Sequence, residues 1–298
     1  MPIRSATRMV SAALTALTAL AAGAAAQGTH DPDTLRVALL PDEDAATVIQ
    51  DNAPLAAHLE EALGRGVEMV VTTDYSSMIE AMRFGRIDVA YFGPVSYTIA
   101  KDRVAGGAID IEPFAARVTD GATTYRSVLI ANADAGIAAL ADVAGSGIDV
   151  AFGDPASTSS HYAPRYALLG EGAVAGEDYT PRFTGAHDAV ARNVELGNAP
   201  IGGLSEPIFE RLVERGTIDA DRVVVLGHTA ALPQYPWVLR TDLTAALQDR
   251  IRAAFLDLEA GTAMGDAVLA PFKAEGFAPI DDAAFDVIRD IRRTVQDE

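Results

Sequence analysis

Short, nearly continuous apolar runs alternate along the chain with longer segments in which apolar residues recur every three or four positions. The first pattern is typical of buried strands and the second of amphipathic helices. Residues 35–40, 67–73 and 87–93 predict strands, and residues 45–64 and 76–85 predict the helices between them. This strand-helix-strand-helix-strand order indicates parallel strands with helices on the faces of the sheet.

The same alternation begins again in the second half of the chain. We expect strands over 127–132 and 148–153, a helix over 159–170, a strand over 181–185, a helix over 187–197, and strands over 199–206 and 222–227. The helical patterns over 244–261 and 281–296 follow no strand of their own, so we expect them to pack back onto the first domain. The chain therefore predicts an α/β protein with two mixed, mostly parallel sheets flanked by helices.

Composition limits the classes of partner. The chain has 298 residues, of which 49% are hydrophobic, which is enough to bury two cores. Its net charge of -19 argues against broad contact with nucleic acid or anionic lipid, because both bind basic surfaces. The chain has no cysteine, which excludes a disulfide framework, a thiolate metal site, a cysteine nucleophile and a cysteine-linked lipid anchor.

An export signal is expected over residues 1–26. Arg4 and Arg8 give a basic start, small apolar residues follow, and three alanines ending at Ala26 form a small-residue cleavage site. A membrane anchor is the alternative, but Ala, Ser, Thr and Gly dominate the segment and make it weakly hydrophobic for a permanent span. We therefore expect a free periplasmic protein.

Four consecutive hydroxyl side chains, Ser157 to Ser160, lie between a Gly-Asp-Pro turn and a predicted helix. A tight turn leading into a helix presents unpaired backbone N–H groups, and one Ser or Thr there can cap the helix. Four hydroxyls exceed what a cap uses. Together with the helix dipole, such donors can bind a tetrahedral oxyanion without lysine or arginine. The stretch predicts an anion site, with simple capping as the alternative.

Three segments carry a family resemblance: PDEDAATVIQDNAPLAAHLEEALG (41–64), IEAMRFGRIDVAYFGPVSY (79–97) and FGDPASTSS (152–160). Together they resemble the periplasmic substrate-binding proteins of phosphonate, phosphite and phosphate ABC transporters. The resemblance runs from about residue 35 to the C-terminal helices. It implies a two-lobed, type II-like, monomeric binding protein that closes about a hinge and passes its ligand to an ABC transporter permease. It implies no cofactor, no metal and no enzymatic activity.

The two lobes divide the chain unequally. After the signal, we expect the first lobe to be discontinuous and to comprise residues 27–124 and 232–298, while the second comprises residues 125–231. The ligand is expected in the cleft between them, because ligands of open α/β sheets bind beyond the carboxyl ends of the strands.

The resemblance also implies ligand-binding residues. It puts the phosphonate group against Ser157, Thr158 and Ser159 and against His187, with Tyr75 and Tyr125 donating phenolic O–H groups. Tyr97 is a further candidate, although Tyr97, Tyr91 and Phe92 belong to a largely apolar stretch that favours packing. For His187 the alternative is a satisfied histidine near a helix start.

Selectivity would depend on the far side of the cleft. Family members that take aminoalkyl phosphonates hold the ammonium group with two carboxylates; Glu206 matches the first, but Tyr235 stands where the second is expected. Glu206 with Tyr235 could still hold an amine by ion pairing and cation–π contact, as in 2-aminoethylphosphonate. Alternatively, Glu206 accepts a hydrogen bond from a protonated phosphite or phosphate, or is a solvated acid at a helix start.

The same residue types are compatible with three other functions. A ferric-ion-binding protein could use the tyrosines with His187 and Glu206 as hard ligands. A periplasmic sensor would present the bound form to a receptor rather than to a permease. Ser157, His187 and Glu206 could also be imagined as a hydrolytic triad, but the chain lacks a Gly-x-Ser-x-Gly elbow, a Gly-x-x-x-x-Gly-Lys loop and a His-Glu-x-x-His zinc motif.

Overall fold

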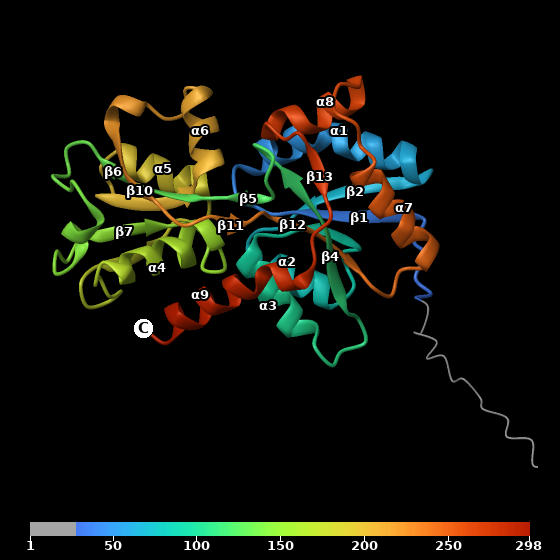
Figure 1. Ribbon diagram of the computed structural model, residues 1–298, viewed down its shortest axis with the longest axis horizontal. Helices are drawn as coiled ribbons and strands as arrows, with labels where there is room; N and C mark the ends of the chain where they lie inside the picture. The colour runs from blue at the N-terminus through green and yellow to red at the C-terminus, as the bar shows by residue number, and fades with distance from the viewer. Residues whose placement is uncertain (1–27) are drawn as a thin grey trace, which may run out of the picture.

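The computed structural model describes residues 28–298, so the predicted export signal over residues 1–26 lies outside the described residues. Two α/β lobes lie side by side, with lobe 1 on the right and lobe 2 on the left of Figure 1. Within the described range, no helix is both long enough and apolar enough to cross a membrane.

Lobe 1 is built on a six-stranded sheet in the order β13-β4-β12-β3-β1-β2. The strands are β1 (Thr34–Leu39), β2 (Gly66–Val71), β3 (Val89–Tyr91), β4 (Ile111–Val118), β12 (Pro236–Arg240) and β13 (Gly276–Ala278). Strand β1 pairs in parallel with β2 and β3, whereas the other three pairings are antiparallel. The sequence of β1 is buried almost throughout, as expected of a strand covered on both faces.

Six helices cover the lobe 1 sheet. They are α1 (Ala45–Leu63), α2 (Tyr75–Arg83), α3 (Pro94–Val104), α7 (Ala245–Leu256), α8 (Ala263–Leu269) and α9 (Asp286–Gln296). Helices α7 and α8 pack with α1, and α9 packs with α3, so the C-terminal helices contact helices of lobe 1. Helix α9 also contacts α4 of lobe 2, and Figure 1 shows it running beneath both lobes.

Lobe 2 is built on a five-stranded sheet in the order β10-β6-β9-β7-β8. Its elements are β6 (Ser127–Asn132), β7 (Asp149–Phe152), the π-helical turn η2 (Thr158–Tyr162), α4 (Ala163–Gly170), β8 (Thr180–Phe183), α5 (His187–Glu195), β9 (Ile201–Ser205), α6 (Glu206–Glu214) and β10 (Val223–His228). Strand β7 pairs in parallel with β8 and β9, while β6 is antiparallel to β9 and β10. The sheets are mixed as predicted, but parallel pairs do not predominate in either of them.

Four 3₁₀ turns complete the described structure: η1 (Leu140–Val143), η3 (Ala220–Arg222), η4 (Ala270–Phe272) and η5 (Asp282–Phe285). The chain passes between the lobes twice, where β5 (Thr124–Tyr125) and β11 (Leu232–Pro233) form a two-stranded antiparallel ribbon. The predicted lobe boundaries, after residues 124 and 231, fall within or beside this ribbon. We propose that the ribbon is the hinge, because it carries both connections between the two sheets.

Each lobe has its own hydrophobic core. The lobe 1 core surrounds Trp237, whose side chain is fully buried and packs against Tyr91 and Phe255. Lobe 2 has two separate apolar clusters, one including Val190 of α5 and the other Leu168 of α4. The sheets are thereby held rigid, and the loops at their ends face one another across the gap between the lobes.

Candidate functional site

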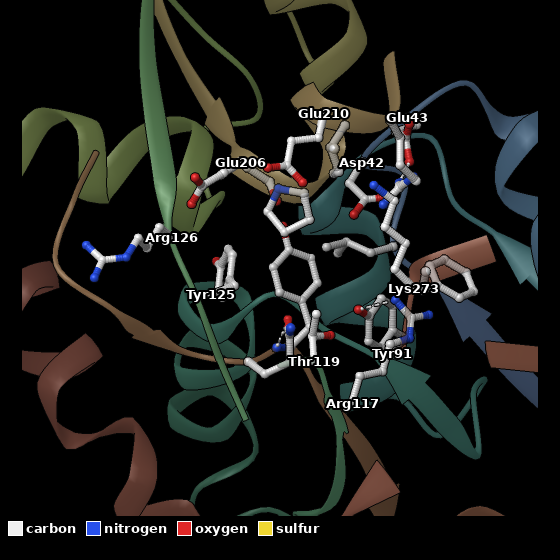
Figure 2. Close-up of a pocket in the computed structure, with 18 of the residues that line it drawn as sticks. Asp42, Glu43, Tyr91, Arg117, Thr119, Tyr125, Arg126, Glu206, Glu210 and Lys273 are labelled. Carbon is white, nitrogen blue, oxygen red and sulfur yellow. Dashed lines mark hydrogen bonds and ion pairs between the residues drawn. The ribbon is translucent and has the colours of Figure 1, made fainter. Parts of the chain in front are cut away.

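A cavity of about 580 Å³ lies between the lobes. Figure 2 shows charged and aromatic side chains converging on it from opposite walls, with Tyr125 and Glu206 on one side and Asp42 and Glu43 on the other. The wall comes from the loop after β1, the ends of β3 and β4, the ribbon, the start of α6 and the segment after η4. All of these belong to the loops and element ends that face between the lobes.

The predicted hydroxyl run is buried behind the cavity wall: none of its four residues lines the cavity, but Ser159 contacts Tyr235, which does. Ser157 caps η2, and its oxygen accepts a hydrogen bond from the N–H of Ser160 at 3.1 Å. The oxygen of Thr158 accepts from the N–H of Val95 at 2.7 Å. In each case the hydroxyl oxygen accepts a hydrogen bond from a backbone N–H. The hydroxyl hydrogen therefore remains free to donate to another group.

The other two hydroxyls have different partners. Ser159 Oγ lies 3.2 Å from the Tyr235 hydroxyl, so these two groups share a hydrogen bond. Ser160 Oγ donates to the carbonyl of Gly203 at 2.6 Å and accepts from the N–H of Gly153 at 2.9 Å. The first three hydroxyls therefore have donor capacity for a ligand, whereas Ser160 is committed to holding the turn against β9.

Three buried tyrosines surround the hydroxyl run. The rings of Tyr125 and Tyr235 pack edge to face with centroids 5.1 Å apart, and the Tyr125 hydroxyl has no hydrogen-bond partner among the described residues. Tyr75 begins α2, and its N–H donates to Asp154 at 3.2 Å. Burial raises the pKa of all three phenols well above its ordinary value, so they are neutral donors.

His187 is the first residue of α5 and is completely buried. Its Nδ1 accepts a hydrogen bond from the backbone N–H of Ser205 at 3.0 Å. Because a backbone N–H can only donate, the neutral ring carries its proton on Nε2. Burial, and secondarily the charge of Arg211, lowers the pKa of His187 to about 3, so the ring stays neutral at physiological pH. Nε2 is buried without a partner, which makes it an available neutral donor.

The two lobes touch at this point. The N–H of His187 donates to the carbonyl of Asp42 at 2.9 Å, and Val95 of lobe 1 donates to Thr158 of lobe 2. Arg211 of lobe 2 pairs with Glu43 of lobe 1, and both side chains are largely buried. The lobes are therefore closed around the hydroxyl run, which removes it from bulk water and strengthens each hydrogen bond formed there.

Arginines line the wider cavity, which the sequence pattern did not predict. The Arg117 guanidinium stacks over Phe272, 3.3 Å from the ring centroid, and donates to the Tyr91 hydroxyl at 2.9 Å. Arg126 donates to the carbonyl of Thr229 at 2.9 Å. These cations offset the overall acidity locally, and the hydrogen bonds that they make go to protein partners, but Nε of Arg117 is buried without a partner among the described residues.

The remaining predicted site residues lie apart from the hydroxyl run. Glu206 lines the cavity, but its carboxylate is paired with Nε2 of His228 at 3.0 Å. Tyr97 is fully buried against Phe285, and its hydroxyl donates to Asp282 on the outer side of lobe 1. The structure does not bring Tyr97 to the cavity, because α3 turns this face toward α9.

Several cavity residues were not anticipated. Asp42 and Glu43 belong to the segment 41–64, which the sequence identifies only as one of the segments that carry the family resemblance. Arg117 lies in β4, for which the sequence pattern predicts no strand. An arginine directly after the apolar run 113–116 is the one local signal that could have pointed to it.

The low pKa of His187 predicts an acid-sensitive fold. In the unfolded chain this histidine titrates near its ordinary pKa of 6.5, so below that pH the unfolded state binds a proton that the native state does not. The free energy of unfolding should fall by about 1.4 kcal/mol per pH unit below about pH 6.5 on this account. In His187→Gln this loss of stability on acidification is absent. His161, whose pKa is lowered by burial to about 4, contributes a loss of the same kind in both proteins.

Urea unfolding at about pH 7 and about pH 5 measures this difference. The loss of stability between the two values should be about 2 kcal/mol smaller in His187→Gln than in the wild type. An equal loss in both proteins would show that His187 is not buried in its neutral form.

Comparison with known proteins places this geometry in a family. Residues 37–285 match the model of the family described as ABC transporter, phosphonate, periplasmic substrate-binding protein. The phosphate-import protein PhnD of Mycolicibacterium smegmatis is 29% identical over 279 residues, which is 87% of this chain and 85% of that protein. The phosphonates-binding periplasmic protein of Escherichia coli is 28% identical, over 68% of this chain and 60% of its own length.

A solved structure shares the two-lobed fold. The binding protein from Prochlorococcus marinus in complex with methylphosphonate superimposes with a TM-score of 0.82 at 20% identity, covering 89% of this chain and 99% of that one. With the match to the family model over most of its length, the chain belongs to the periplasmic substrate-binding proteins of phosphonate ABC transporters.

Proposed function

We propose that the protein captures a small phosphorus oxyanion, preferentially a phosphonate such as 2-aminoethylphosphonate, between its lobes and delivers it to an ABC transporter permease. The observation that carries this proposal is the pair of buried, unpartnered groups beside the hydroxyl run, the Tyr125 hydroxyl and His187 Nε2. A buried donor without a partner costs about 1–3 kcal/mol. An oxyanion held there would accept from both.

The donor set matches a tetrahedral oxyanion. Ser157, Thr158 and Ser159 supply three hydroxyls from one turn, and Tyr125 and His187 supply two further neutral donors from neighbouring elements. Neutral donors suit an anion whose oxygens each accept several hydrogen bonds. A ferric ion would instead require ionised phenolates, which the burial of Tyr75, Tyr125 and Tyr235 disfavours by raising their pKa.

The organic part of the ligand would occupy the wider cavity. Its volume of about 580 Å³ leaves room beyond one phosphonate group, and its wall includes the carboxylates of Glu206 and Glu210. A cationic tail would find compensating charge there. The printed names of the relatives support a phosphorus ligand, with methylphosphonate in the Prochlorococcus marinus complex and phosphate in the name of the Mycolicibacterium smegmatis protein. Phosphate or phosphite in the same donor set is the second candidate.

Removing one donor should weaken every phosphorus ligand alike. Tyr125→Phe deletes only the hydroxyl, keeps the ring packed on Tyr235, and should reduce the affinity for methylphosphonate and phosphite by about tenfold. Ser157→Ala and Thr158→Ala should each have an effect of similar size. Calorimetric titration of both ligands measures the change.

Tyr97→Phe is the matched control, because it deletes a tyrosine hydroxyl that donates to Asp282 outside the cavity. Its affinities should equal those of the wild type. If Tyr125→Phe and Tyr97→Phe behaved alike, the proposed anion site would be in the wrong place.

Glu206→Gln tests the assignment of a cationic tail. A glutamine is uncharged and cannot form an ion pair with an ammonium group. The affinity for 2-aminoethylphosphonate should therefore fall about tenfold, while that for methylphosphonate is retained. Equal weakening of both ligands would mean that Glu206 acts through its contact with His228 on lobe closure rather than on the amine.

A further inference from the structure

Asp42 is a buried carboxylate that faces the ligand cavity without a partner. It lies in the loop between β1 and α1, is 9% exposed, and lines the cavity. Within residues 28–298 its carboxylate accepts no hydrogen bond from another residue, whereas the neighbouring Glu43 is paired with Arg211. Figure 2 shows the Asp42 carboxylate directed toward the middle of the cavity. A buried carboxylate normally has partners, so this one needs an explanation.

The same residue lies at the edge of the proposed anion site. Its backbone carbonyl accepts the N–H of His187 at 2.9 Å, which holds Asp42 directly across from the start of α5. Its charge is close enough to raise the pKa of both Tyr75 and Tyr235, which flank the hydroxyl run. Asp42 therefore lines the cavity together with Tyr125 and Tyr235, two of the tyrosines beside the hydroxyl run, and its backbone contacts His187.

The surroundings of Asp42 do not neutralise it. Burial and the neighbouring Glu43 raise its pKa to about 7, against the opposing charges of Arg211 and Arg117. The titratable and charged groups that face it are Glu43 from its own loop, Arg211 from α6, Arg117 from β4, Tyr91 from β3, Tyr75 from α2, Tyr235 from the loop before β12, and His187 from α5. His187 is neutral and the phenols are protonated, so they contribute no formal charge.

An ionised carboxylate and a doubly ionised phosphorus oxyanion repel each other strongly when both are out of water. Phosphorus oxyanions lose their second proton near neutral pH, so one proton can be retained at little cost. We propose that Asp42 and the bound phosphorus oxyanion share a single proton. Asp42 then makes binding depend on the protonation state of the ligand.

The sharing follows from simple proton balance. The ionised Asp42 carboxylate, the doubly charged oxyanion and one proton from solvent give one complex with an O–H···O hydrogen bond between carboxylate and ligand. A sulfonate of the same shape has no proton to share at neutral pH. The site should therefore prefer a phosphonate over an isosteric sulfonate, because a site built around a ligand O–H discriminates against an analogue lacking it.

This inference rests on the proposed phosphorus ligand and is tested by counting protons. Calorimetric titration of the wild-type protein with methylphosphonate at about pH 8.5, in buffers of different ionisation enthalpy, should show uptake of about one proton per ligand bound. Binding without proton uptake would overturn the inference and leave the proposed function standing. Absence of binding by any phosphorus oxyanion would overturn both.

The variant Asp42→Asn tests whether the proton taken up on binding is shared with this carboxylate. The proton uptake should fall to near zero, and the preference for methylphosphonate over methanesulfonate should fall at least about tenfold. Glu210→Gln is the matched control, because it neutralises another carboxylate of the same cavity and should leave the proton uptake unchanged. Equal uptake in Asp42→Asn and the wild type would overturn the assignment. The wild-type measurement stands by itself if Asp42→Asn does not fold.

Discussion

The arrangement of the cleft depends on one constraint: hydrogen-bond donors that are buried must find an acceptor. Between the lobes, the Tyr125 hydroxyl and His187 Nε2 are buried and lack one within the described residues. Both are neutral, because burial raises the pKa of the phenol and lowers that of the imidazole. An oxyanion placed against the hydroxyl run would satisfy them. The proposed ligand class would thus account for these buried polar groups, which the fold alone leaves without partners.

Closure of the lobes and binding of the anion are connected through the same residues. Thr158 accepts the N–H of Val95 across the gap, and His187 donates its N–H to Asp42. These contacts leave the hydroxyl of Thr158 and the ring of His187 available to the ligand. A ligand that bridges both lobes would therefore favour the closed conformation by its differential affinity for it, which is what a hinge-closing binding protein requires.

In the proposed recognition of the anion, charged groups would contribute less than neutral hydrogen-bond donors. The protein is strongly acidic, and the arginines of the cavity already donate to Glu43, Tyr91 and a backbone carbonyl, although Nε of Arg117 and of Arg211 is buried without a partner among the described residues. The anion would be recognised by oriented dipoles in a site closed off from water, where each hydrogen bond is worth more than in solvent. Asp42 would then add discrimination between ligands, because a nearby carboxylate tolerates only an anion that shares a proton with it.

Much of the fold was predictable from periodicity. The apolar runs at residues 35–40 and 148–153 became β1 and β7, and the pattern over 244–261 contains α7. The antiparallel strands β4 and β12 were not predicted, because their direction and pairing depend on how the chain returns through the hinge, which no local pattern encodes. Tyr97 was included among the ligand candidates, but its orientation is set by packing against Phe285.

The candidate site, like the fold, could be predicted from the sequence only in part. The Ser157–Ser160 run by itself predicts an anion site, with simple capping as the alternative, since adjacent hydroxyls at a helix start can serve either purpose. Ser160 differs from the first three because its hydroxyl donates to the carbonyl of Gly203, which is remote in sequence, so this difference could not be predicted locally. Asp42 carries no local signal, because its burial depends on contacts with residues that are remote in sequence, such as His187.

The central claim, recognition of a phosphorus oxyanion by neutral donors, is tested most directly by a crystal structure of the protein with methylphosphonate. The account predicts phosphonate oxygens within about 3.2 Å of the Ser157, Thr158 and Tyr125 hydroxyls and of His187 Nε2. A phosphonate bound instead to the guanidinium groups of Arg117 and Arg211, with Tyr125 and His187 still unpartnered, would contradict it.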